Sequence, residues 1–284
     1  MPHVADAGQL DTRGIMAFLD IDADNALFYL HTPPKGDKPT FVFVNALTGT
    51  TDHWEAVVAP ALRAEGFGTL SYNFRGQAES RYSPEMELTP TVIVEDLVRV
   101  CVGLAPQRPI LVGLSIGGLF AAQAIRAGVN AEGLVYLNTI REIGPRIAWV
   151  NDALGVFAAS TGVGVMMDAT FPMLVNPDFL TSARPNMLKG QIAPLPADHP
   201  HANLMRNSAS ADWAFPWDSL SLPTLNITGL CDRVFLDKPI VDSWLDRLAD
   251  VTREEWADCG HLIPLERPEK LAQSLSKFGT QLAG

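Results

Sequence analysis

A strand-like apolar run that leads directly into a glycine-flanked serine constrains the fold of this sequence most. The run Ile-Leu-Val at 110–112 is followed by Gly-Leu-Ser-Ile-Gly at 113–117, and a helical apolar pattern continues from there. A sharp turn between strand and helix strains the backbone of its central residue, and only residues without a Cβ fit two positions before and after it. The spacing of Gly113 and Gly117 around Ser115 therefore predicts a strand, a tight turn and a helix.

A serine presented on such a turn is a candidate nucleophile. Serine is a poor nucleophile at its own pKa, so a base must take its proton and an acid must fix the tautomer of that base. The helix that follows points its first amides toward the site, where negative charge would develop. Because so short a pattern also occurs by chance, the hypothesis depends on the rest of the chain.

Apolar, β-rich runs alternate with helical patterns along the chain, which is typical of an α/β fold with a mostly parallel sheet between helices. Eight strands are predicted, the first two as a hairpin, at 15–21, 26–31, 40–45, 69–74, 109–113, 133–138, 224–228 and 251–256. Helices are predicted at 53–65, 91–104, 116–127 and 268–281. A chain of 284 residues fits one such core with one large insertion.

The stretch 140–222 breaks this alternation. We predict a core of residues 1–139 and 223–284, and a helical lid at 140–222 inserted after the sixth strand, where it would form walls of a substrate pocket. The stretch is rich in methionine, which adapts its shape to apolar ligands: Met166, Met167, Met173, Met187 and Met205. The candidate substrate contacts are Asn45, Trp149, Met166, Met167 and Met173. Two plainer interpretations stay open, namely helices that only cover the sheet edge and methionines that belong to an ordinary core.

The partners that the serine needs follow it in chain order. Asp232 lies just past the strand predicted at 224–228, in a loop at the same edge of the sheet as Ser115. His261 lies after the last predicted strand and before the final helix. We therefore predict Ser115 as nucleophile, His261 as base and Asp232 as the acid that orients the base.

Other residues fit these roles less well. The remaining histidines lie in the N-terminal tail, at a strand end, at a helix start and in a Pro-flanked lid segment: His3, His31, His53, His199 and His201. The lid pair could bind a metal, but we favour a solvated loop and predict no metal site. The rival acids are Asp237 and Asp242, in post-loop or helical sequence, and Asp258. Asn138 follows the sixth strand but cannot carry the charge.

With these residues in place, the chain resembles the α/β-hydrolase superfamily from about residue 25 to 282. Residues 73–80, Asn-Phe-Arg-Gly-Gln-Ala-Glu-Ser, look like the Asp-x-Arg-Gly-x-Gly-x-Ser turn that follows the fourth strand in many members. Residues 45–49, Asn-Ala-Leu-Thr-Gly, lie where the family has His-Gly-x-x-Gly, with Asn and Ala in place of His-Gly. The resemblance implies that the N–H of Leu47 joins that of Ile116 in an oxyanion hole.

The resemblance also implies an activity. It is that of a serine hydrolase that cleaves a carboxylic ester, lactone, thioester or amide through an acyl-enzyme, without metal or organic cofactor. The lid composition adds the expectation of a small, mainly apolar substrate. A serine at 115 disfavours haloalkane dehalogenation and epoxide hydrolysis, whose enzymes in this superfamily use Asp there. Two alternatives remain: acyl transfer to an alcohol, since residues 45–49 resemble the His-Ala-Leu-Thr-Gly run of homoserine O-acetyltransferases, and a non-catalytic small-molecule receptor.

The charge and the N-terminus exclude other partners. A formal net charge of -11 disfavours nucleic acid and anionic membranes, because binding to both depends on clustered Lys and Arg. Residues 1–14 lack the basic and apolar regions of a signal peptide, and no apolar run reaches the roughly 18 residues that span a bilayer. We therefore expect a cytoplasmic protein that binds a small-molecule substrate. No sequence feature indicates an oligomeric state.

The three cysteines are an odd number without framework spacing, which suits free thiols in a reducing compartment. Two of them adjoin the predicted site, because Cys231 precedes Asp232 and Cys259 lies two residues before His261. If the two loops meet, oxidation could join these thiols. Chance proximity is the interpretation that we favour.

Overall fold

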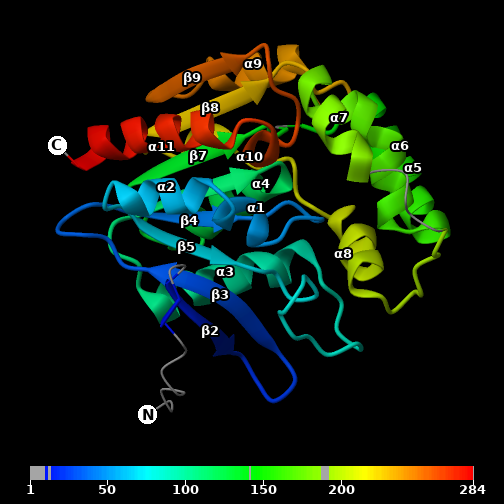
Figure 1. The fold of residues 1–284 in the computed structure, drawn as a ribbon, viewed down its shortest axis with the longest axis horizontal. Helices are drawn as coiled ribbons and strands as arrows, with labels where there is room; N and C mark the ends of the chain where they lie inside the picture. The colour runs from blue at the N-terminus through cyan, green and yellow to red at the C-terminus, as the bar shows by residue number, and fades with distance from the viewer. Residues whose placement is uncertain (1–9, 12–13, 141, 187–191, 284) are drawn as a thin grey trace.

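The structure, a computed structural model, describes residues 10–11, 14–140, 142–186 and 192–283, and over these ranges a nine-stranded sheet forms the centre of the molecule. Its order is β1-β2-β3-β5-β4-β6-β7-β8-β9 (Figure 1). The strands are β1 (Leu10–Asp11), β2 (Gly14–Asp20), β3 (Ala26–Thr32), β4 (Thr40–Val44), β5 (Gly68–Tyr72), β6 (Pro109–Leu114), β7 (Gly133–Leu137), β8 (Thr224–Gly229) and β9 (Val251–Trp256).

The sheet is mostly parallel, as predicted. From β5 through β4, β6, β7 and β8 to β9 every neighbouring pair is parallel, while β1, β2, β3 and β5 pair antiparallel. All eight predicted strands are present, and the first two form the predicted hairpin. The additional strand β1 has two residues, too few to give the period-two pattern on which a strand prediction depends.

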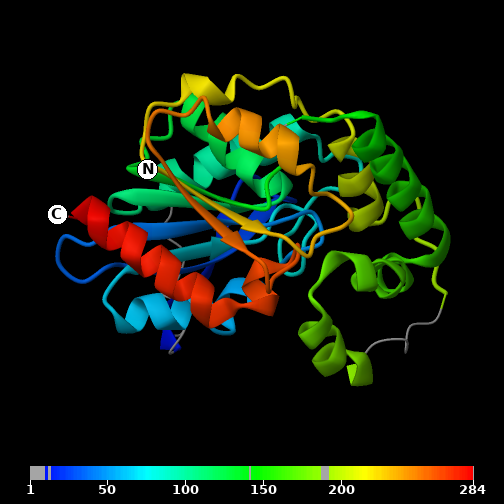
Figure 2. The same ribbon diagram turned by 90° about the horizontal axis from the view of Figure 1, so that it is seen from above.

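Helices cover both faces of this sheet. They are α1 (Asp52–Glu55), α2 (Val58–Ala64), α3 (Pro90–Leu104), α4 (Ile116–Arg126), α5 (Pro145–Thr161), α6 (Val163–Leu174), α7 (Pro177–Ala183), α8 (Pro200–Ser208), α9 (Lys238–Leu245), α10 (Ile263–Glu266) and α11 (Pro268–Ala283). Alternate residues of β4 pack on opposite faces, so that Val42 contributes to the core under α3 and α4, and Phe43 to the core under α2 and α11. Figure 2 shows α11 and α4 on these opposite faces.

The helix predicted at 53–65 is divided into α1 and α2. Pro60 explains the division, because it has no N–H to donate to the carbonyl of Ala56 and its ring would collide with that carbonyl. The other predicted helices are present as α3, α4 and α11, with ends shifted by one or two residues. The short helices α9 and α10 are additional.

Four of the helices that the structure describes, α5 to α8, lie between β7 and β8 in the chain, and we call them the cap. Figures 1 and 2 show the cap at the end of the sheet toward which the parallel strands point. Part of it packs on the core through a buried apolar cluster in which Phe171, Leu174 and Val175 contact Val234 and Leu262. The cap therefore lies over the loops that follow the strands, which is the edge where ligands bind in open α/β sheets.

Candidate active site

Ser115 lies on the turn between β6 and α4. Its backbone angles, φ 56° and ψ −123°, lie in a region that non-glycine residues rarely adopt. A Cβ added at Gly113 would collide with the backbone of Gly118, and one added at Gly117 would collide with the carbonyl oxygen of Val44. Both glycines are therefore required by close backbone contact around the strained serine, as the sequence pattern predicts.

Asp232 and His261 lie in the loops after β8 and β9, and their side chains are in contact. The Asp232 Oδ2 atom is 2.7 Å from His261 Nδ1, and both residues are 4% exposed. The other oxygen, Oδ1, accepts hydrogen bonds from the N–H groups of Val234 at 3.0 Å and Phe235 at 2.9 Å. The carboxylate is thus fixed by its own loop, with one oxygen left to orient the imidazole.

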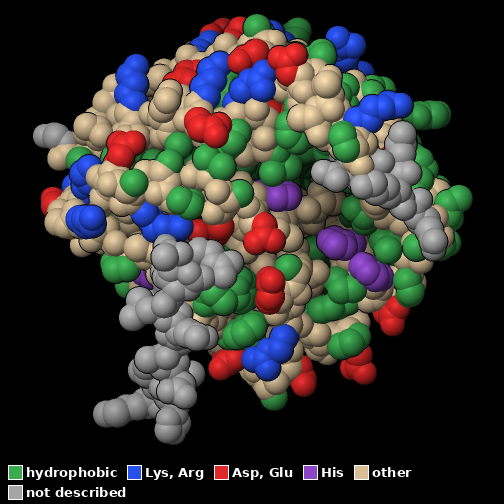
Figure 3. Space-filling model, in the orientation of Figure 1, with side chains coloured by type: hydrophobic (Ala, Val, Ile, Leu, Met, Phe, Trp, Pro, Cys, Tyr) green, Lys and Arg blue, Asp and Glu red, His purple; other side chains and the backbone are tan. Residues whose placement is uncertain are grey.

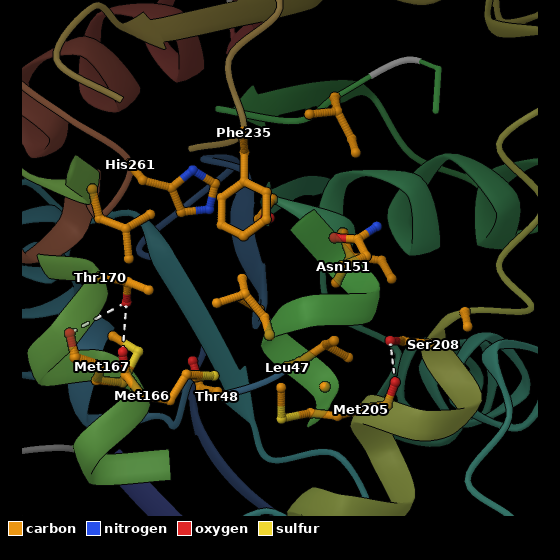
Figure 4. Close-up of a pocket in the computed structure, with 18 of the residues that line it drawn as sticks. Leu47, Thr48, Asn151, Met166, Met167, Thr170, Met205, Ser208, Phe235 and His261 are labelled. Atoms are coloured by element: carbon orange, nitrogen blue, oxygen red, sulfur yellow. Dashed lines mark hydrogen bonds between the residues drawn. The ribbon is translucent and has the colours of Figure 1, made fainter. Parts of the chain in front are cut away.

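Ser115 and His261 line the same pocket, together with residues of the cap. Figure 4 shows His261 beside Phe235 in this pocket. The imidazole packs against the Phe235 ring, with 4.8 Å between the ring centroids. Figure 3 shows hydrophobic side chains around a hollow in this face of the molecule. The fold thus brings the three side chains of the predicted triad to one edge of the sheet, from loops that lie far apart in the chain.

Leu47 and Ile116, whose N–H groups are predicted to form the oxyanion hole, both line this pocket. Among the described residues, neither N–H donates to an acceptor. The loop that carries Leu47 is held by Gln77, whose Nε2 donates to the carbonyls of Ala46 at 2.8 Å and Leu47 at 3.0 Å. The fold itself therefore uses neither donor, and their role in an oxyanion hole stays a prediction.

Asn45 does not line the pocket, and its prediction as a substrate contact is wrong. It is 1% exposed, and its Oδ1 accepts a hydrogen bond from Trp54 Nε1 at 2.7 Å. Its Nδ2 donates to the Tyr72 carbonyl at 3.0 Å and to Gln77 Oε1 at 3.1 Å. The side chain points into the core, where it satisfies these buried polar groups. Through Gln77 it also supports the loop that carries Leu47.

The cap supplies much of the pocket wall. Met166 and Met167 lie in it, but Trp149 and Met173 do not, so their prediction as substrate contacts is wrong. Trp149 is 78% exposed on the outer face of α5, and Met173 is 47% exposed near the end of α6. Met187 lies outside the described residues. Wall residues that the sequence did not single out as substrate contacts include Thr48, Asn151, Thr170, Met205, Ser208, Trp213 and Phe235.

The other histidines and acids that were considered for the triad, where the structure describes them, do not line the pocket that contains Ser115. Among the histidines and carboxylates that the structure describes, only His261 and Asp232 pair with each other. Hydrogen bonds from Lys270 and Arg267 lower the pKa of Asp258 to about 2. His199 and His201 stack on each other at the start of α8, and no group of three metal-binding side chains is found among the described residues.

The two cysteine loops do meet, through a hydrogen bond of 2.8 Å from the Cys231 N–H to the Cys259 carbonyl. Both thiols are free, and Cys231 Sγ donates to the Ala257 carbonyl at 3.3 Å. Burial raises the pKa of the Cys259 thiol. Because thiol oxidation proceeds through the thiolate, this environment disfavours a disulfide between the two loops.

The chain is similar to several known hydrolases. Its sequence matches the Alpha/beta hydrolase family over residues 41–274. The 3-oxoadipate enol-lactonase 1 of Acinetobacter baylyi is 28% identical over 251 residues, which cover 85% of this chain and 89% of the lactonase. The enol-lactonase from Burkholderia xenovorans LB400 has a TM-score of 0.74 at 21% identity, over 93% of this chain and 100% of that one. A thermophilic esterase from Thermogutta terrifontis has a TM-score of 0.76 at 19% identity, over 95% and 99% of the two chains.

The family match spans most of the chain and includes Ser115, Asp232 and His261, so this protein belongs to the alpha/beta hydrolase family. The resemblance predicted from the sequence is confirmed, and the protein is a hydrolase. No helix of the described residues combines the length and the apolar character that crossing a membrane requires.

Proposed function

We propose that this protein hydrolyses small, mainly apolar carboxylic esters or lactones through an acyl-enzyme on Ser115. The observation that carries the proposal is the 2.7 Å contact between Asp232 and His261, in a pocket that His261 shares with Ser115. A buried carboxylate fixed on Nδ1 keeps the proton there and leaves Nε2 free to accept the serine proton. The names of the similar proteins, enol-lactonase and esterase, agree with this reaction class.

The mechanism follows from these roles. His261 Nε2 takes the proton of Ser115 as Oγ forms a bond to the substrate carbonyl carbon. The resulting oxyanion accepts hydrogen bonds from the N–H groups of Leu47 and Ile116. Collapse of this intermediate breaks the bond to the leaving alkoxide, which receives the proton from His261. A water molecule then attacks the acyl-enzyme, with His261 again taking and returning the proton, and releases the acid.

The pocket limits the substrate by size and polarity. Its cavity of about 170 Å³ is close to the cavity of about 150 Å³ that accommodates benzene. The wall is mostly apolar, with Met166, Met167 and Leu174 among its residues. The hydroxyl of Thr170 donates to the carbonyl of Met166 at 2.9 Å, so it presents an acceptor rather than a donor to the cavity. We infer an acyl group about the size of one ring or a short chain.

A series of p-nitrophenyl esters tests this proposal. We expect kcat/KM to be highest for short or single-ring acyl groups and to fall steeply once the chain outgrows the cavity, because an acyl group that does not fit holds its carbonyl away from Ser115. A fluorophosphonate probe should inactivate the enzyme, and mass spectrometry of the digest should find its adduct on Ser115. Stable phosphonylation of another residue only, or a ligand-induced rise in Tm without any turnover, would contradict the proposal and favour a receptor.

The side chain of Gln77, which holds the loop that carries Leu47, gives a second test of the proposal. Gln77→Ala removes both hydrogen bonds to the Ala46 and Leu47 carbonyls but leaves the Leu47 N–H in place. We expect kcat to fall about tenfold, less than the 10²–10³-fold loss that follows removal of an oxyanion donor itself. KM should change little, because the loop acts mainly on the transition state.

Gln107→Ala is the matched control for this variant. Its Nε2 also donates to two carbonyls, those of Gly36 at 2.9 Å and Lys38 at 3.3 Å, in an exposed loop away from the pocket. Steady-state kinetics on one ester should separate the two variants. Equal kcat values for Gln77→Ala and Gln107→Ala would show that the hydrogen bonds of Gln77 do not serve the oxyanion hole.

A further inference from the structure

Glu266 is a buried carboxylate at the end of α10, and the mechanism above does not use it. It is 5% exposed, and both of its oxygens accept hydrogen bonds. Oε1 accepts from the N–H of Leu262 at 2.9 Å, and Oε2 accepts from the N–H of Gly260 at 2.8 Å. These two donors flank His261 in the chain. The carboxylate therefore holds the backbone on both sides of the predicted base.

The same carboxylate also binds the cap. Oε2 accepts hydrogen bonds from the backbone N–H and from the side-chain Nδ2 of Asn176, each at 2.7 Å. Asn176 caps the N-terminus of α7 through Oδ1, which accepts from Phe179 N–H at 3.0 Å. A single side chain thus joins the junction of α6 and α7 to the loop that carries His261.

A second contact links the cap and this loop. The N–H of His261 itself donates to the Leu174 carbonyl, at the end of α6, at 2.6 Å. Gly260 permits the approach, because a Cβ there would collide with that same carbonyl oxygen. On the core side, Asn138 Nδ2 donates to the carbonyls of Gly260 at 2.7 Å and His261 at 3.0 Å. The backbone polar groups of residues 260 and 261 are therefore all satisfied, half of them by the cap and Glu266.

We propose that Glu266 positions His261 and couples it to the cap. The base is then aligned with Ser115 only while the α6–α7 junction is packed against the His261 loop. This rests on the proposed function, because it assigns His261 the role of base. Glu266 lines no part of the pocket and contacts neither Ser115 nor the imidazole, so it is a positioning residue rather than a catalytic one. Its effect is on orientation, to which reaction rates are steeply sensitive.

The decisive variant is Glu266→Gln. A carboxamide keeps the size of the side chain but has an NH2 group in place of one acceptor oxygen. That NH2 group would face the N–H groups that now donate to Glu266. We expect kcat on a small activated ester to fall by about 10²-fold, the cost of misplacing a catalytic group by about 1 Å, while KM changes far less. Hydrogen–deuterium exchange should become faster at residues 260–262 and at Asn176. Glu266→Asp, which keeps the charge on a shorter side chain, serves as the second variant if Glu266→Gln does not fold.

Glu55→Gln is the matched control. Glu55 is also buried, and it accepts hydrogen bonds from Ser71 Oγ at 2.6 Å and Arg63 at 2.8 Å, but neither partner lines the pocket. We expect it to lower Tm and leave kcat unchanged. If Glu266→Gln lowers Tm to a similar extent and retains the wild-type kcat, the positioning role is rejected.

The cap side of the contact is tested by Asn176→Asp, which keeps the oxygen that caps α7 but replaces the donor Nδ2 with a second acceptor facing Glu266. A lower kcat is expected, although Asn176 does not line the pocket. Wild-type kcat in this variant would reject the coupling to the cap. A wild-type enzyme that turns over no ester would instead reject the proposed function, and exchange at residues 260–262 would then still decide whether Glu266 holds the loop.

Discussion

Ser115→Ala is expected to lower kcat on a small activated ester by about 10⁶-fold, the loss seen when a serine nucleophile is removed from a working triad. No other side chain of the proposed mechanism can form the acyl-enzyme, so the residual rate should reflect only the oxyanion donors and substrate binding. The fold should persist, because alanine has the same Cβ as serine and meets the same strain at φ 56°. Thermal unfolding should therefore give a Tm close to that of the wild type, and the fluorophosphonate adduct should disappear.

Ser243→Ala controls for the loss of a serine hydroxyl. Ser243 is exposed on α9, where its Oγ donates to the Ile240 carbonyl at 2.8 Å, and it does not line the pocket. Its kcat should equal that of the wild type. Substantial ester hydrolysis by purified Ser115→Ala, with the same substrate preference as the wild type, would exclude Ser115 as the nucleophile.

The sheet, and the position of Ser115, Asp232 and His261 at one edge of it, could be predicted from the sequence because both depend on local chain geometry. Gly113 and Gly117 are required where the backbones of β6 and α4 approach other backbone atoms, so the pattern carries its own structural reason. Asp232 and His261 each follow a recognisable strand, and parallel strands that end at one edge bring their loops together. Chain order and strand ends were therefore sufficient to place these residues.

The pocket wall could not be predicted in the same way, because it depends on which face of each cap helix meets the core. Trp149 and Val156 are seven residues apart on α5 and are both exposed, so apolar character does not mark the inner face of that helix. Asn45 shows a second limit. Its position in the chain is that of a pocket residue, but its hydrogen-bonding capacity is taken up by Trp54 and Gln77 within the core.

Gln77 and Glu266 are functional candidates to which the sequence analysis assigned no role. Gln77 lies in the turn at 73–80 that the sequence did identify, but only the folded structure shows that its amide reaches the Leu47 loop. Glu266 precedes an amphipathic helix, where an acidic residue is ordinarily solvated. Its contact with the cap joins residues 90 positions apart, so the coupling could not be predicted from the local sequence.

Asp232→Asn is expected to lower kcat by about 10⁴-fold, through the tautomer of His261 rather than through its position. The N–H groups of Val234 and Phe235 both need an acceptor, so the amide oxygen of the new side chain will keep facing them. The amide nitrogen of that side chain then faces His261 Nδ1 and donates to it, which requires Nδ1 to be unprotonated. The neutral imidazole must therefore carry its proton on Nε2, where it cannot accept the proton of Ser115.

Asp258→Asn separates this effect from a general loss of negative charge near the base loop. Asp258 is two residues before Gly260, but its oxygens bind Arg267 and Lys270 at 3.0 Å each, and it does not contact His261. We expect wild-type kcat in Asp258→Asn and a Tm for Asp232→Asn within a few degrees of the wild type, since the side-chain size and the two loop hydrogen bonds are kept. If Asp258→Asn instead showed the 10⁴-fold loss and Asp232→Asn did not, the acid would have been misassigned, because only the residue on Nδ1 controls which ring nitrogen holds the proton.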